Sequence, residues 1–270
     1  MTTDVKRGGR VLVRRHPRPD ATGEVLCFAH AGGSPGEYAR WSDELPDAVR
    51  LSAVQLPGRG ARAAEPPATT VEEIAEEIAT TARPTVPFVL FGHSFGGLLA
   101  LAVARTLRAR GGPAPERLVV SASPAPPLPR AATPLHTLPD DAFLAEVERR
   151  WGRLPDPVRE RPELLERAVA AFRADVTAFE TYRCPPGDPL DCPVTAFVGD
   201  EEEDALPPGR WAATTRGPLT VRVLPGGHFY LRGETQRAAI LAEFRAALHH
   251  PTTTDPGAPE APAATTGRHQ

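Results

Sequence analysis

The sequence predicts an α/β protein, with a mostly parallel sheet, helices on both faces of the sheet and a helical lid inserted between two strands. Short apolar runs alternate with helix-like segments along most of the chain, and this pattern is typical of a sheet covered by helices on both sides. One long segment, residues 124–189, contains no strand-like run and interrupts the alternation. The length of 270 residues and the 41% hydrophobic content suit one large domain with an insertion.

Seven apolar runs predict the strands, and helix-like segments lie between them. The strand candidates are Val11–Val13, Val25–Phe28, Leu51–Val54, Pro87–Phe91, Leu118–Ser121, Val194–Val198 and Val221–Leu224. The helix candidates outside the insertion are Glu37–Glu44, Val71–Thr81, Phe95–Arg110 and Thr235–Leu248. We therefore expect the domain to occupy residues 10–249.

The ends of the chain are expected to be disordered, over residues 1–9 and 250–270. Residues 251–270 contain no aliphatic side chain larger than alanine. Such a segment cannot bury enough apolar surface to offset the entropy of ordering.

The lid prediction rests on the segment 124–189, which opens with a proline-rich stretch. Two helix-like runs follow, Asp140–Trp151 and Pro162–Tyr182. A helical insertion between two strands lies over the strand ends, where ligands bind in sheets of this kind. We interpret the segment as a lid, and the alternative is a packed helical subdomain with no role in access.

Composition excludes several classes of function. The formal net charge of −3 gives no reason to expect nucleic-acid binding. No run of 18 apolar residues predicts a membrane span, and the first ten residues lack the apolar core of a secretory signal. The three cysteines, Cys27, Cys184 and Cys192, have no metal-binding spacing. We expect a cytoplasmic monomer with no metal and no cofactor.

The candidate nucleophile is Ser94, at the centre of a G-x-S-x-G motif. An apolar run precedes the motif and an Ala/Leu-rich run follows it, so the serine lies at a strand–turn–helix junction. A serine hydroxyl is a poor nucleophile unless it is exposed beside a base, with donors for the oxyanion. Gly92 and Gly96 let backbone segments approach closely at such a turn. The context favours a catalytic serine over a structural turn.

A base and an acid follow the serine along the chain, in the order that the α/β-hydrolase arrangement requires. His228 lies on a Gly-Gly loop before the last helix and is the candidate base. The acid belongs to the acidic run 200–204, where Asp200, Glu202 and Asp204 compete. Five adjacent carboxylates cannot all be buried. No histidine accompanies them, so no metal site is expected there.

The oxyanion hole needs two backbone donors. One is the amide of Phe95, directly after the nucleophile, and the other comes from the loop after an early strand. The loop His30–Ser34 follows the second strand candidate, and its glycines free it to turn its amides inward. We choose Ala31 as the second donor.

Taken together, four motifs in this order resemble the type II thioesterases, stand-alone hydrolases that accompany modular polyketide and nonribosomal peptide synthases. The motifs are His30–Gly33, Gln55–Arg59, Gly92–Gly97 and Gly226–Phe229, and the likeness runs from about residue 10 to residue 248. The resemblance implies an α/β-hydrolase fold with a helical lid. It also implies that the protein hydrolyses acyl thioesters on the phosphopantetheine arm of an acyl or peptidyl carrier protein, clearing misprimed or stalled chains.

Site residues carry over by position in the motifs. Ser94 matches the nucleophile, His228 the base, and Ala31 and Phe95 the oxyanion donors. At the acid this chain departs from the family, which usually has an aspartate a few residues beyond the strand glycine. Glu202 stands at that distance, but counting back from the following helix favours Asp200, because the loop looks shortened. We expect Asp200 to be the acid and keep Glu202 as the alternative.

Two further expectations concern the lid. Carrier proteins are typically acidic, so arginines around the lid are candidates for a docking surface. The candidates are Arg149, Arg150, Arg153, Arg159 and Arg161. The alternative is that these arginines are ordinary solvated surface residues. Apolar lid residues could line an acyl chamber, although their helical spacing favours a place in the hydrophobic core; these residues are Leu144, Val147, Trp151, Leu165 and Phe172.

The competing functions are a carboxylesterase or other serine hydrolase of the same fold, a cyclising thioesterase domain, and a non-catalytic hydrolase-like binding protein.

Overall fold

The computed structural model describes residues 11–128, 133–185, 187–202 and 207–249. A seven-stranded sheet runs through the molecule in the order β1-β3-β2-β4-β5-β6-β7. The strands are β1 (Leu12–Val13), β2 (Gly23–Phe28), β3 (Val49–Val54), β4 (Phe88–His93), β5 (Arg117–Ser121), β6 (Val194–Gly199) and β7 (Leu219–Leu224). Among the described strands only β1 pairs antiparallel with its neighbour; the other pairings are parallel. The predicted α/β fold with a mostly parallel sheet is confirmed.

Helices connect the parallel strands and cover the sheet. The α-helices are α2 (Pro35–Ala39), α3 (Val71–Ala82), α4 (Phe95–Ala109), α5 (Asp140–Trp151), α6 (Asp156–Arg159), α7 (Pro162–Thr181) and α8 (Glu234–Leu248). Short 3₁₀ helices lie at η1 (Arg40–Glu44), η2 (Gly60–Arg62), η3 (Leu135–Thr137), η4 (Pro208–Thr214) and η5 (Tyr230–Arg232).

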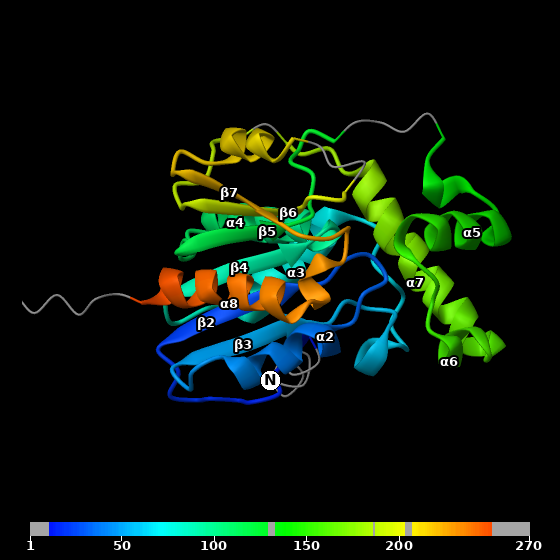
Figure 1. Ribbon diagram of the computed structural model, residues 1–270, viewed down its shortest axis with the longest axis horizontal. Helices are drawn as coiled ribbons and strands as arrows, with labels where there is room; N and C mark the ends of the chain where they lie inside the picture. Colours follow the sequence, from blue (N-terminus) through cyan, green and yellow to red (C-terminus); the bar gives the residue numbers. More distant parts are fainter. Residues whose placement is uncertain (1–10, 129–132, 186, 203–206, 250–270) are drawn as a thin grey trace, which may run out of the picture.

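The two faces of the sheet carry separate hydrophobic cores. In Figure 1, α2 and α8 lie in front of the sheet, and α3 and α4 lie behind it. Side chains alternate between the faces along each strand. In β2, Val25 and Cys27 pack in the core with α2 and α8, whereas Leu26 and Phe28 pack in the core with α3 and α4. Burial on both faces explains why the strands read as continuous apolar runs.

Two details differ from the expectations. The segment Glu37–Glu44 is not one helix, because the α-helix begins at Pro35 and gives way to the 3₁₀ helix η1 at Arg40. Ser34 caps α2 by accepting a hydrogen bond from the amide of Gly36, so the start signal lies before the predicted helix. The short helix α6 was not predicted. The two tails expected to be disordered lie outside the described residues.

The helical insertion, defined here as α5, α6 and α7, lies between β5 and β6 in the chain and at one end of the sheet (Figure 1). Its residues Phe143, Val147, Phe172 and Val176 form a small hydrophobic cluster with Leu135 of η3. The carboxyl-terminal part of α7 instead belongs to the core behind the sheet, through Ala178 and Tyr182 at its end. Helix α7 therefore packs both in the cluster of the insertion and in the core of the main domain.

The expected apolar residues of the insertion divide between buried and half-buried positions. Val147 and Phe172 are buried in its cluster, together with Phe143, which was not among the expected residues. Leu144 and Leu165 are half-buried. Within the described residues no helix is long and apolar enough to cross a membrane.

Candidate active site

The nucleophile turn places Ser94 between β4 and α4 in a strained backbone conformation. Ser94 has φ 54° and ψ −120°, which L-residues rarely adopt. Its amide donates to the carbonyl of Ser121 over 2.8 Å, and its carbonyl accepts from the amide of Gly97 over 3.0 Å. Ser94 occupies the N-cap position of α4, but its side chain makes no capping hydrogen bond. The hydroxyl therefore remains available for chemistry.

Two glycines make this turn sterically possible. A methyl group at Gly92 would run into the backbone of Gly96, and a methyl group at Gly96 would run into the carbonyl of Phe28. The start of α4 therefore packs directly against the ends of β2 and β4. This close approach brings the loop after β2 next to the nucleophile turn.

His228 and Glu202 form a hydrogen-bonded pair at the ends of β7 and β6. The Nδ1 atom of His228 lies 2.7 Å from Oε1 of Glu202. The two side chains are only 18% and 14% exposed, so the pair is shielded from solvent. The ring of His228 lies 5.1 Å, centroid to centroid, from that of His93, the residue that precedes Ser94. The geometry thus brings the predicted base to His93 of the nucleophile turn. Within the described residues the Nε2 of His228 has no hydrogen-bond partner.

The expectation that Asp200 would meet this histidine is wrong, because Glu202 occupies that position. Asp200 is exposed and accepts a hydrogen bond from the amide of Gly226 over 2.8 Å. The physical reason is the course of the chain after β6. Asp200 still follows the strand, with its amide bonded to the carbonyl of Leu224, whereas Glu202 lies beyond the turn. Asp204 lies outside the described residues.

Aromatic rings surround the base. Phe229 stacks edge-on against His228 at 5.1 Å and against His30 at 4.9 Å between centroids. His93 is fully buried, and its Nδ1 lies 3.0 Å from the hydroxyl of Ser121. Burial lowers the pKa of His30 to about 4, partly offset by Glu37. Burial also lowers the pKa of His93 well below its ordinary value, aided by the neighbouring histidines.

These buried histidines predict a loss of stability in mild acid. A group whose pKa is lower in the folded protein binds its proton first in the unfolded chain, so protonation favours unfolding. Between pH 7 and pH 5 the free energy of unfolding should fall, by on the order of 2 kcal/mol from His30 alone. Urea unfolding at several pH values measures this slope. The His30→Gln variant should show a shallower slope, and an unchanged slope would contradict the argument.

Two backbone amides are available as oxyanion donors. Phe95 is the first residue of α4, so its amide has no acceptor within the helix. Among the described residues the amide of Ala31 likewise donates to no other group. Ala31 lies in the loop after β2, beside Gly32, whose φ is +72°. Both predicted donors therefore come from segments that meet at the nucleophile turn.

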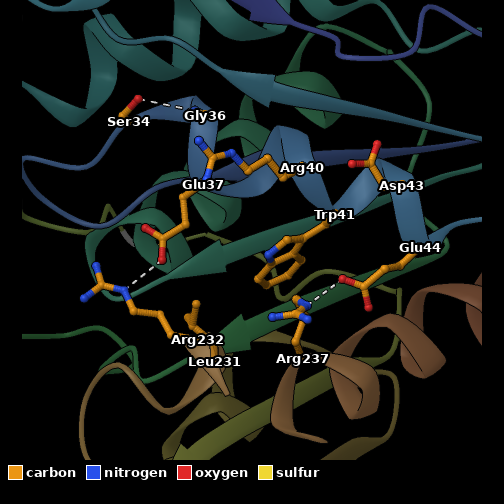
Figure 2. A pocket seen from close by; sticks show the side chains of 10 residues that line it. All are labelled: Ser34, Gly36, Glu37, Arg40, Trp41, Asp43, Glu44, Leu231, Arg232 and Arg237. Carbon is orange, nitrogen blue, oxygen red and sulfur yellow. Dashed lines mark hydrogen bonds and ion pairs between the residues drawn. The ribbon is translucent and has the colours of Figure 1, made fainter. Parts of the chain in front are cut away.

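A surface cavity of about 650 Å³ lies between the α2–η1 segment and the start of α8. Figure 2 shows Glu37 reaching Arg232 and Glu44 reaching Arg237 across it. The residues that line the cavity do not include Ser94. This cavity is therefore a hollow beside the site, with much of its charge paired internally. No group of three or more metal-ligating side chains occurs in the part of the chain that the structure describes.

Several residues near the site had no role in the sequence analysis. The hydroxyl of Tyr230 lies 2.6 Å from that of Ser121, which continues the hydrogen-bonded chain beneath His93. Arg59 ends the Gln55–Arg59 motif, and it pairs with Asp175 of α7. The sequence did contain one signal for this pair. Asp175 is a carboxylate among the apolar positions of a helix, and such a group needs a partner when it is buried.

Comparisons with known proteins agree with this geometry. Residues 24–248 match the family model described as thioesterase domain. The chain is 39% identical to thioesterase PikA5 of Streptomyces venezuelae over 231 residues, which are 84% of this chain and 82% of that protein.

Solved structures of thioesterases have the same fold. The RedJ thioesterase of the prodiginine pathway of Streptomyces coelicolor superposes with a TM-score of 0.77 at 39% identity, over 85% of this chain and 92% of that one. BorB, the type II thioesterase of the borrelidin cluster, has a TM-score of 0.75 at 36% identity, over 86% and 94%.

Proposed function

This chain belongs to the thioesterase family, as a type II thioesterase of α/β-hydrolase fold, and we propose that it hydrolyses acyl thioesters carried by acyl or peptidyl carrier proteins. The observation that carries the proposal is the Glu202–His228 pair beside a serine at positive φ. Ser94, His228 and Glu202 are the proposed triad. Clearance of misprimed or stalled chains is the proposed role in the pathway.

In the first half of the reaction Ser94 attacks the carbonyl carbon of the thioester. His228 takes the hydroxyl proton at Nε2, while Glu202 holds the Nδ1–H and stabilises the imidazolium. The amides of Phe95 and Ala31 donate to the oxyanion of the tetrahedral intermediate. The carbon–sulfur bond then breaks, and the imidazolium returns its proton to the departing thiolate. The products of this step are an acyl-serine and a free thiol.

In the second half a water molecule attacks the acyl-serine, with His228 again accepting a proton. Collapse of the second tetrahedral intermediate returns the proton to Ser94 and releases the carboxylic acid. A thiol is a better leaving group than an amine, so the first half requires less acid assistance than peptide hydrolysis does.

The docking arginines proposed from the sequence have acidic partners within the insertion. Arg149 and Arg150 both bond to Glu146, and Arg159 bonds to Glu148. One carboxylate, Glu146, serves both Arg149 and Arg150, so this cluster keeps a net positive charge.

A parallel assay of three substrates tests the proposed function. The substrates are an acyl group on a phosphopantetheine-bearing carrier protein, the same acyl group on N-acetylcysteamine, and its p-nitrophenyl ester. We expect kcat/KM to be highest for the carrier-bound thioester and lowest for the ester, because the leaving group and its arm are recognised together. Equal or faster turnover of the ester would identify a carboxylesterase instead. Failure of a fluorophosphonate to label the protein would favour a binding role.

A further inference from the structure

The insertion reaches the main domain through a buried ion pair between Asp175 of α7 and Arg59 of the loop after β3. Nη1 and Nη2 of Arg59 each lie 2.6 Å from a carboxylate oxygen of Asp175, so the pair is bidentate. The side chains are 12% and 1% exposed. The two residues lie 116 positions apart in the sequence. A pair that is so well shielded and so specific in geometry holds the segments that carry it at a fixed distance.

The same carboxylate also holds the oxyanion-side loop, defined as residues 30–34. Oδ2 of Asp175 accepts a hydrogen bond from the amide of Gly32 over 2.7 Å. Nη1 of Arg59 donates to the carbonyl of Gly33 over 3.3 Å. The ring of Phe172 lies against Gly32, where an added Cβ would be 2.9 Å from its Cγ. Helix α7 therefore contacts this loop through a charge, a backbone hydrogen bond and an aromatic ring.

These contacts determine where the amide of Ala31 points. The carbonyl of His30 accepts from the amide of Gly33 over 2.9 Å, which fixes the peptide plane between His30 and Ala31. In a trans peptide the N–H points opposite to the carbonyl, so the direction of the Ala31 N–H is fixed with it. Asp175 fixes the next peptide plane through Gly32. The proposed donor is thus held from both sides.

We infer that Arg59 and Asp175 are positioning residues, which hold the amide of Ala31 toward the oxyanion and couple its direction to the seating of α7. The inference rests on the proposed function, because it assigns the pair a part in stabilising the tetrahedral intermediate. Neither side chain needs to touch the substrate. A displacement of α7 would release Gly32 and turn the donor away, so the site would be complete only when the insertion is seated.

The test compares Asp175→Asn with Asp140→Asn in the full chain. Asp140 of α5 pairs with Arg173 of α7, the helix that carries Asp175, but Asp140 is 83% exposed, which makes it a matched control. For Asp175→Asn we expect kcat on acyl-N-acetylcysteamine to fall about 10- to 100-fold, with KM nearly unchanged, because a small misplacement of one donor acts on the transition state. The control should keep kcat within about twofold of the wild type.

Two further readouts separate positioning from mere stability. A trifluoromethyl ketone that forms a tetrahedral adduct with Ser94 should lose affinity by a factor similar to that of kcat. Hydrogen exchange should accelerate over residues 29–35 in Asp175→Asn and remain unchanged in the control. Equal kcat and equal adduct affinity in the variant and the wild type would overturn the inference. An inactive wild type would instead refute the proposed function.

A second variant guards against misfolding caused by one uncompensated charge. The double substitution Arg59→Gln with Asp175→Asn removes both charges and keeps a polar side chain at each position. It should fold and still show the loss in kcat, since the bidentate geometry is gone. A double variant with the wild-type kcat would overturn the inference.

Discussion

Replacing Ser94 with alanine is expected to abolish thioester hydrolysis and to leave the fold intact. The hydroxyl is the proposed attacking group, and removing it leaves only binding and the oxyanion donors to act on the substrate. Loss of a triad serine typically lowers kcat by a factor of about 10⁴ or more. Alanine keeps the Cβ atom, and no capping hydrogen bond is lost with the hydroxyl. The thermal midpoint should therefore remain close to that of the wild type.

A suitable control for Ser94→Ala is Ser123→Ala. Ser123 also follows a strand of the sheet, and its buried hydroxyl makes no hydrogen bond within the described residues. Its removal should leave kcat near the wild-type value. Release of the thiol from an acyl-N-acetylcysteamine, followed with a chromogenic disulfide, measures both variants. Residual turnover near the wild-type rate in Ser94→Ala would show that another nucleophile acts.

The second large effect is expected for Glu202→Gln. An amide has nearly the same shape as the carboxylate but cannot stabilise the imidazolium that forms on His228, and it can hold the ring in the wrong tautomer. We expect kcat to fall by a factor of about 10² to 10⁴ with little change in KM. The loss follows from the 2.7 Å contact between Oε1 and Nδ1.

Asp200→Asn is the matched variant for this prediction. Its remaining oxygen can still accept from the amide of Gly226, so the loop that carries His228 keeps its anchor. Its kcat should change by no more than about threefold, in line with exposed substitutions elsewhere. The reverse outcome, with activity lost in Asp200→Asn and kept in Glu202→Gln, would return Asp200 to the role of the acid.

The choice between Asp200 and Glu202 as the proposed acid could not be made from the sequence. The strand before the acidic run could be predicted from its apolar residues, and His228 from its loop and its position after Ser94. The choice among neighbouring carboxylates depends on where the chain turns after Gly199, because each residue added rotates the side chain to another direction. Asp200 remains in register with β7, and the longer side chain of Glu202 reaches the ring from beyond the turn.

The pairing of Arg59 with Asp175 could not be predicted for a different reason. Strand and helix periods describe neighbours along the chain, whereas this contact joins a loop to a helix in the insertion. A carboxylate on an apolar helix face indicates that a partner exists but not which residue it is. Phe143 was missed in a similar way, because which of several apolar positions faces inward depends on how α5 lies against α7.

Helix α7 is held more firmly at its carboxyl-terminal end than at its amino-terminal end. Its 20 residues span about 30 Å, and its last turns are embedded in the core behind the sheet. A displacement of the end near Pro162 therefore decreases along the helix toward its packed carboxyl-terminal turns. We therefore expect an outward displacement of α5 and α6 to move Asp175 less than it moves Pro162, which would leave the proposed Ala31 donor in place.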